Sequence, residues 1–229
     1  MKQLLRTTAI TLVALGASAS AANAQFYKDV FKPHGASISV GGTGLFSTPL
    51  ESNPTSGTFN VPRVGGGTLS ETVSNQHQDT TWSAGFITSL QFHPKPWAGL
   101  ELNYGFSRFS EVYSYNYSST PTVQSSKVTT DMHEYTAAYQ FHPKHILFQP
   151  FVNVGGGYVE FIPGTASSQF RETGLLEAGF DIPTHTKHIG FRIEGRSLYY
   201  RAPNFENSAI STRSWRVTTE PSISTYYRF

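Results

Sequence analysis

The segment Ser214 to Phe229, SWRVTTEPSISTYYRF, alternates two kinds of side chain with a period of two. One parity is largely apolar and consists of Trp215, Val217, Thr219, Pro221, Ile223, Thr225, Tyr227 and Phe229. The other parity is polar and carries Arg216, Glu220 and Arg228. Successive side chains of a β-strand point to opposite faces, so the segment is predicted to be a strand with one apolar and one charged face.

The first residues have the pattern of an export signal. Lys2 and Arg6 precede an uncharged apolar run from Ala9 to Ala17, and Ala22-Asn23-Ala24 forms a small-residue cleavage site. The apolar run is shorter than the roughly 20 residues that a membrane-spanning helix needs. We expect residues 1–24 to be a signal peptide cleaved after Ala24, with a periplasmic leader over residues 25–35. Cleavage removes Lys2 and Arg6, which reduces the formal charge of +2 to zero.

The composition narrows the class of protein further. There is no cysteine, so neither disulfides nor thiol chemistry are available. After the signal there is no apolar run of 18 residues, and the cations are dispersed, which argues against a transmembrane helix and against a nucleic-acid partner. Aromatic residues make up 14% of the chain and charged residues only 14%, which favours an aromatic, β-rich protein.

Seven more segments alternate in the same way as the last one. They cover about residues 36–46, 81–92, 97–109, 130–141, 148–161, 173–180 and 188–200. Long polar stretches (47–80, 110–128, 162–171 and 201–213) alternate with short Pro-containing turns between them. Pro221 lacks a backbone donor, so we expect a bulge or a local break in strand pairing there.

This rhythm predicts an all-β fold, an eight-stranded antiparallel up-and-down transmembrane β-barrel over residues 36–229, with short periplasmic turns and long extracellular loops. Two aromatic girdles are expected. The girdle at the short-turn ends consists of Phe92, Trp97, Phe141, Phe148, Phe180 and Phe229, and the girdle near the long loops consists of Trp82, Phe109, Phe161, Tyr199 and Trp215. The alternative is a soluble β-sandwich, whose outward faces would carry more charge.

With the signal ending Ala22-Asn23-Ala24, eight alternating segments and a terminal Tyr227-Arg228-Phe229, the chain resembles the small OmpA- and OmpX-like outer-membrane barrels. The resemblance implies a porin-like barrel in the outer membrane of a Gram-negative cell envelope. It also implies contact with outer-membrane lipid and lipopolysaccharide, insertion by the barrel-assembly machinery, and a monomeric state. Ile223, Tyr227 and Phe229 would form the C-terminal insertion signal. No peptidoglycan-binding domain is expected after the barrel.

The parity opposite the apolar one should face the barrel interior. Its charged members are Glu101, Glu134, Glu177, Arg192, Glu194, Arg196, Arg216 and Glu220. An eight-stranded barrel is only wide enough for side chains to fill it, and an unpaired charge there is costly, so we expect these residues to interlock as ion pairs. The predicted function is therefore a plugged barrel with a structural or surface-recognition role. The alternative is a small or gated channel through the acid-rich lumen.

The histidines raise the possibility of a metal site or a catalytic site. His93, His142, His145, His185 and His188 lie at or beside the short turns and are interpreted as a polar rim, without the spacing of a metal site. No cofactor is expected.

Lipid A deacylase barrels would require a His-x-Ser pair. The sequence has none, and His133, although near Asp131 and Glu134, has no adjacent serine, so a lipid-modifying enzyme is not predicted. Tyr113, Tyr115 and Tyr117 in the second long loop either recognise a surface partner or extend a hairpin by cross-strand pairing.

Overall fold

The computed structural model describes residues 35–51, 57–62, 68–118, 120–143, 149–164, 166–186, 188–206 and 214–229. The expected signal peptide (1–24) and nearly all of the expected leader (25–35) lie outside these ranges. Within them, no helix is long and apolar enough to cross a membrane. The described chain forms β-strands joined by turns and irregular segments.

The strands are β1 (Ala36–Ser47), β2 (Leu50–Glu51), β3 (Gly57–Pro62), β4 (Thr68–Thr80), β5 (Ser83–Lys95), β6 (Ala98–Tyr117), β7 (Thr120–Phe141), β8 (Gln149–Pro163), β9 (Gln169–Pro183), β10 (Ile189–Arg201) and β11 (Trp215–Arg228). Each of the eight predicted segments coincides with one of them. These eight are β1 and β5 to β11. The alternating pattern therefore located every strand of the barrel, with ends that differ by a few residues.

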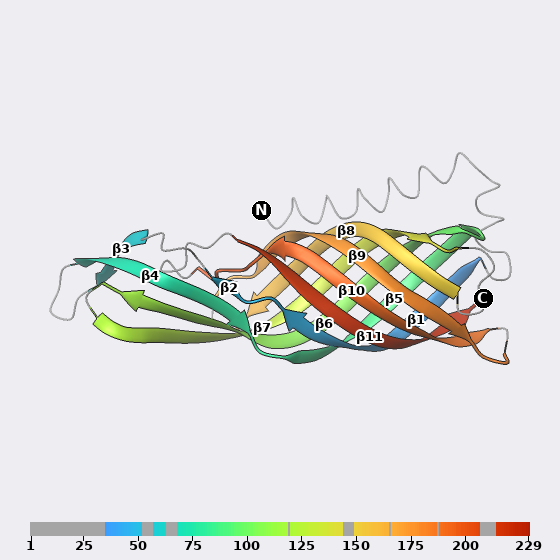
Figure 1. Cartoon of the computed structure of the whole chain (residues 1–229), viewed down its shortest axis with the longest axis horizontal. Helices are drawn as coiled ribbons and strands as arrows, with labels where there is room; N and C mark the ends of the chain where they lie inside the picture. The colour runs from blue at the N-terminus through green and yellow to red at the C-terminus, as the bar shows by residue number, and fades with distance from the viewer. Residues whose placement is uncertain are drawn as a thin grey trace.

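The eight strands form a closed antiparallel ring (Figure 1). The order is β1-β5-β6-β7-β8-β9-β10-β11, and β11 returns to pair with β1, where Ile38 lies opposite Tyr227. All-β architecture and barrel closure are thus confirmed. Closure leaves no free edge within the ring, which allows each strand to satisfy its backbone groups on both sides. We call the end with the short turns the inner end and the opposite end the outer end.

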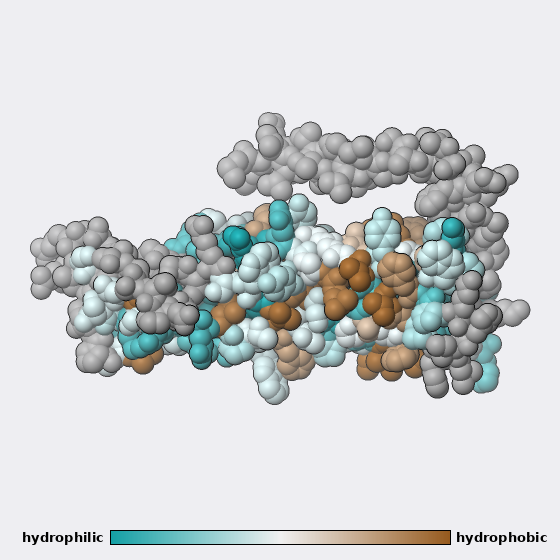
Figure 2. Space-filling model, turned by 45° about the horizontal axis from the view of Figure 1, so that its top comes forward, coloured by the Kyte–Doolittle hydropathy of each residue, from teal (hydrophilic) through white to brown (hydrophobic). Residues whose placement is uncertain are grey.

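Burial follows the two parities of each strand. On β11, Arg216, Thr218 and Glu220 are buried, whereas Trp215 and Ile223 are 46% and 64% exposed. The same alternation on the other barrel strands places apolar groups on the outside, and Figure 2 shows apolar side chains gathered over the barrel. An apolar exterior around a polar interior is the arrangement of a barrel that crosses lipid.

A sheet protrudes from the outer end, where the sequence predicted loops. Residues 47–80 were expected to form a polar loop, and that prediction is wrong for β2, β3 and β4. β4 pairs with the outer part of β6, from Thr80 opposite Glu111 to Val73 opposite Tyr117, and β2 and β3 pair with β4. β4 is rich in Ser, Thr, Gln and Asn, so its side chains gave no apolar alternation by which to recognise it.

β6 and β7 also continue into this protruding sheet. Tyr113 pairs with Ser126 and Tyr115 with Gln124, so the hairpin extends well beyond the barrel. Of the two alternatives for the tyrosines, extension of the hairpin is therefore confirmed. The expected loop 162–171 is also shorter than predicted, because β8 runs to Pro163 and β9 starts at Gln169.

Pro221 produces the local break in pairing that its missing donor predicts. On the β10 side it pairs normally opposite Gly195. On the β1 side, pairs are present at Thr43 with Ser222 and at Phe46 with Thr219, in one register, but not at the two positions between them. The strand keeps its register, and no bulge forms on either side.

Candidate functional site: the barrel lumen

Three arginines from β10 and β11 organise the charged side chains of the lumen. Arg192, Arg196 and Arg216 are each fully buried. Their positions follow from strand parity, which directs every second residue of β10 and β11 inward. Each guanidinium pairs with at least one carboxylate from across the barrel, and those of Arg192 and Arg196 also pair with carboxylates of neighbouring strands.

Arg196 lies at the centre of one cluster. In the sheet it is directly opposite Glu177 of β9 and Glu220 of β11. Its Nη1 donates to Glu220 Oε2 at 2.8 Å and its Nε to Glu177 Oε2 at 3.4 Å. A third carboxylate, that of Glu134 on β7, accepts from both Nη1 and Nη2 across the lumen. One guanidinium therefore holds three acids from three strands.

Arg192 forms a second cluster closer to the inner end. Its Nε and Nη2 bind both oxygens of Asp181 at 2.7 and 3.0 Å, and its Nη1 donates to Glu101 Oε2 at 2.8 Å. The guanidinium also lies 4.1 Å from the ring centroid of Phe151. Asp181 was not among the expected lumen residues because the sequence placed it in a turn. β9 runs to Pro183, and Asp181 keeps the inward parity of Glu177.

Acids outnumber arginines in these two clusters. Among the described residues, the inner layer of the lumen consists of Glu101, Glu134, Glu177, Asp181, Glu194 and Glu220 with Arg192 and Arg196. Several buried acceptors there have no hydrogen-bond partner, including Glu101 Oε1, Glu194 Oε2 and Asn153 Oδ1. The inner layer is therefore strongly acidic and is not fully satisfied by protein groups alone.

Arg216 belongs to the outer end instead. Its guanidinium pairs with Glu111 of β6, at 2.7 Å between Nη2 and Oε1, and both side chains are buried. Glu111 also accepts from Gln78 Nε2 of β4 at 2.7 Å. The sequence prediction missed Glu111 because residues 110–128 looked like a loop. Continuing the parity of Glu101 along β6 would have identified it.

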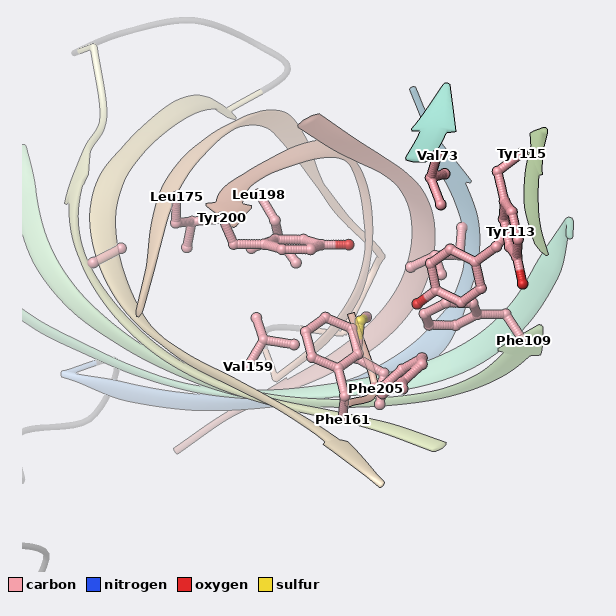
Figure 3. Close-up of a cluster of buried hydrophobic side chains, with 13 residues drawn as sticks. Val73, Phe109, Tyr113, Tyr115, Val159, Phe161, Leu175, Leu198, Tyr200 and Phe205 are labelled. Atoms are coloured by element: carbon pink, nitrogen blue, oxygen red, sulfur yellow. The ribbon is translucent and has the colours of Figure 1, made fainter. Parts of the chain in front are cut away.

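An apolar layer fills the lumen between the inner layer and the outer end. This outer layer consists of Leu45, Phe109, Met132, Val159, Phe161, Leu175, Leu198, Tyr200 and Phe205. Figure 3 shows Leu198, Tyr200, Val159 and Phe161 projecting into the space that the strands enclose. Phe109 and Phe161 were assigned to the outer aromatic girdle, and that prediction is wrong, because they are 3% and 0% exposed and face inward.

The segment that follows β10 closes the outer end. Ala202 and Phe205 are buried, and the Phe205 ring packs against Phe161 and Tyr113. The carbonyl oxygen of Pro203 accepts from Tyr113 Oη at 3.0 Å and from Gln78 Nε2 at 2.8 Å. Residues 202–206 thus fold into the mouth of the barrel and are fixed there by the protruding sheet.

Little space remains in the lumen between the two layers. A cavity lined by Thr43, Ser107, Met132, Glu134, Arg196 and Glu220 has a volume of about 10 Å³. That is about the space required for one water molecule. Side chains therefore occupy the cross-section of the barrel at this height.

The tyrosines proposed for surface recognition are buried or partly buried. Tyr113 is fully buried and Tyr115 is 9% exposed, and both belong to the apolar cluster of the outer end. Tyr117 is partly buried and packs against that cluster. Burial raises the pKa of the Tyr113 phenol, which stays protonated and donates to Pro203. Tyr113 is thus unavailable to an external partner.

Two of the short-turn histidines meet at the inner end. His93 Nε2 and His142 Nε2 lie 3.2 Å apart, and each is within 3.0 Å of Gln140 Oε1. Burial lowers the pKa of His142, which follows β7, to about 4. His188 lies elsewhere, stacked on Tyr227, and His145 is outside the described residues. The contact was not predicted from the sequence, because His93 and His142 are 49 residues apart and meet only through strand pairing.

Among the described residues, His133 forms no ion pair with a carboxylate, although Glu160 of β8 lies opposite it in the sheet. Its Nδ1 contacts Tyr104 Oη at 2.9 Å. Asp131 pairs with Arg108, and Glu134 points into the lumen toward Arg196. The two nearby acids are therefore engaged elsewhere. The C-terminal residues Ile223, Tyr227 and Phe229 point outward and are 64%, 45% and 54% exposed.

The sequence matches no known family model and no curated protein. The fold, however, is that of a small eight-stranded outer-membrane β-barrel. The outer membrane protein OprG from Pseudomonas aeruginosa has a TM-score of 0.51 and 12% identity, with 86% of this chain and 97% of OprG covered. Neisserial surface protein A (NspA) has a TM-score of 0.51 and 10% identity, with 86% and 99% covered. At these identities the likeness shows the fold alone and does not single out the OmpA-like barrels.

Proposed function

We propose that this protein is a bacterial outer-membrane barrel whose lumen is plugged by side chains and whose role is structural or one of surface recognition. The observation that carries the proposal is the filling of the lumen by two layers in series. The inner layer joins β6, β7, β9, β10 and β11 through Arg192 and Arg196. The outer layer is a cluster of aromatic and aliphatic side chains closed by residues 202–206.

Several features support this location and role. The predicted export signal, the apolar exterior and the barrel fold are all features expected of outer-membrane proteins. In this role the partners would be outer-membrane lipid, lipopolysaccharide and, during insertion, the barrel-assembly machinery, with the chain acting as a monomer. Any recognition would use the outward face of the protruding sheet, where Val123 is 64% exposed, because Tyr113 is buried. We propose no catalytic activity for the barrel.

Conductance measurements test the plug. The refolded protein, reconstituted in a planar bilayer, should give no stable conductance steps in molar KCl. Faster gel migration before boiling than after it would verify that the barrel had folded in the same sample. Large, stable steps from a folded sample would contradict the proposal.

The excess of acids favours a second candidate function, a small cation pathway. Glu101 Oε1, Glu194 Oε2 and Asn153 Oδ1 have no hydrogen-bond partner, and carboxyl groups outnumber guanidinium groups around them. A narrow acid-lined passage concentrates cations and excludes anions. A KCl gradient across the bilayer distinguishes the two candidates, because a reversal potential close to that of potassium requires the pathway. A current that does not select for cations would contradict it.

A further inference from the structure

A repeated motif places two histidines beside each other at the inner end of the barrel. Gln91-Phe92-His93-Pro94-Lys95 recurs as Gln140-Phe141-His142-Pro143-Lys144. The first copy ends β5 and the second ends β7, and both strands pair with β6 between them. The two imidazoles therefore reach across β6, and their Nε2 atoms lie 3.2 Å apart.

A third polar atom completes the group. Gln140 Oε1 lies 2.8 Å from His93 Nε2 and 3.0 Å from His142 Nε2. The orientation of this amide follows from its other end, because Gln140 Nε2 donates to Glu101 Oε2 at 2.9 Å. Glu101 is in turn held by Arg192 at 2.8 Å. The inner layer thus directs the amide oxygen of Gln140 toward both histidines.

Hydrogen bonding alone satisfies this triangle poorly. A neutral imidazole carries one N–H, and two Nε2 atoms in contact require one ring to donate and the other to accept. Gln140 Oε1 has only acceptor capacity, so when one ring donates to the other, two acceptors share one proton. In a tetrahedral zinc site with bonds of about 2.0–2.1 Å, two ligand atoms lie roughly 3.3 Å apart. Edges of 2.8, 3.0 and 3.2 Å are close to that spacing.

We propose that His93 Nε2, His142 Nε2 and Gln140 Oε1 bind one divalent transition-metal ion of the zinc and copper class at the inner mouth of the barrel. Water completes the coordination. Imidazole nitrogen is a preferred ligand for these ions, and the amide oxygen is a weaker third donor. Within the described residues no three His, Asp, Glu or Cys side chains are placed so that they could hold a metal ion, so the amide oxygen is needed as the third ligand.

The surroundings permit such an ion to enter. Both histidines are only partly buried, which leaves a path from the inner end. The charges facing them are Arg192, Arg228 and Asp181, of which Arg192 is paired with Asp181 and Glu101. Gly99 of β6 is also required, because a Cβ there would lie 2.8 Å from Phe92 O and 3.0 Å from the His93 ring. A bound ion would join the ends of β5 and β7 across β6.

Metal titration tests the site. Tag-free barrel, refolded in detergent and free of metal, is titrated with Zn²⁺ by calorimetry and with Cu²⁺ by electron paramagnetic resonance. One equivalent should bind, with nitrogen hyperfine structure in the copper spectrum. His93→Ala and His142→Ala should each weaken binding by about tenfold or more, since changes to outer-shell partners of metal sites already cost that much. His185→Ala, in the exposed turn between β9 and β10, is the matched control and should bind as the wild type does.

A measurement on the unchanged protein guards against variants that fail to fold. Zn²⁺ should shift the imidazole Nε2 resonances of both His93 and His142 in ¹⁵N spectra, with saturation at one equivalent. If neither resonance shifts, or if the double variant His93→Ala/His142→Ala binds as tightly as the wild type, the site does not exist.

Discussion

Arg196 and Glu220 lie directly opposite each other on β10 and β11, with 2.8 Å between Nη1 and Oε2. Glu177 occupies the matching position on the other side of Arg196, on β9, and Glu134 reaches the same guanidinium from across the lumen. The arginine thus connects one row of the sheet to the opposite wall of the barrel. All four side chains are at most 2% exposed.

Replacing Arg196 should be among the most damaging single changes in the lumen. Arg196→Met leaves three buried acids without their cation, and removing one partner of a buried pair typically costs about 3–5 kcal/mol. Urea unfolding of the refolded barrel in detergent or liposomes, followed by tryptophan fluorescence, would measure the loss. Arg201→Met is the matched control on the same strand, because Arg201 is exposed. Its guanidinium carbon lies 5.3 Å from the ring centroid of Trp215, and within the described residues it has no ion pair.

The same cluster allows a rescue experiment. Adding Glu134→Gln, Glu177→Gln and Glu220→Gln to Arg196→Met removes the uncompensated charge. Replacing a complete buried ion cluster is often nearly neutral for stability, so most of the lost free energy of unfolding should return. A quadruple variant no more stable than Arg196→Met alone would show that packing, not charge, causes the loss.

Close backbone approach at β8 gives a second prediction. A Cβ at Gly155 would overlap the carbonyl oxygen of Ala137, and one at Gly157 would overlap that of Tyr135, both on β7. Gly157→Ala should therefore force β7 and β8 apart and lower the yield of folded barrel, measured as the fraction with fast migration before boiling. Gly195→Ala is the matched control, because a Cβ at Gly195 meets nothing within 4 Å. Equal yields for both variants would contradict the prediction.

The sequence revealed the ring of strands but not what lies beyond it. Segments between lipid and lumen must alternate, because each strand has an apolar and a polar environment on its two faces. β4 belongs to the sheet that protrudes beyond the barrel, and its Ser, Thr and Gln side chains carry no apolar alternation. Residue type also misled the prediction for the outer layer. Phe109 and Phe161 have the inward parity, but as aromatic residues near the strand ends they were assigned to a membrane girdle.

Contacts between distant strands could not be predicted from the sequence, for a different reason. Parity shows that Arg192 and Arg196 face inward, but the choice of partner depends on strand register and on which walls face each other across the barrel. Asp181 and Glu111 were missed because they lie where the alternation fades into a turn or a protruding hairpin. The His93–His142 contact depends on the pairing of β5 and β7 with the same strand, β6.

The arrangement of two layers in series predicts how conductance should respond to variants. Phe161→Ala/Phe205→Ala thins the outer layer only, and the inner layer should still block ion flow. Combining it with Glu134→Ala/Arg196→Ala removes two large groups from each layer and should produce measurable steps in planar bilayers. If the apolar double variant alone conducts as well as the quadruple variant, the inner layer does not contribute to the plug.

Phe229 should matter for assembly, whereas the lumen should not. Phe229 is 54% exposed on the outside of the barrel and its backbone N–H donates to Ala36 O at 3.0 Å, where β11 closes against β1. Its ring also lies 5.3 Å from that of Tyr227. Deleting Phe229 removes part of the expected insertion signal, so expression in cells should yield less heat-modifiable protein in the outer-membrane fraction.

Glu220→Gln is the matched comparison on the same strand. It changes a buried partner of Arg196 without altering the outward face of β11, so the protein should reach the outer membrane in normal amounts. Its purified barrel should nevertheless unfold at lower urea, because one charged hydrogen bond to Arg196 is weakened. The prediction is contradicted if Glu220→Gln lowers the outer-membrane level and the Phe229 deletion does not. Assembly would then depend on the lumen and not on the outward face of β11.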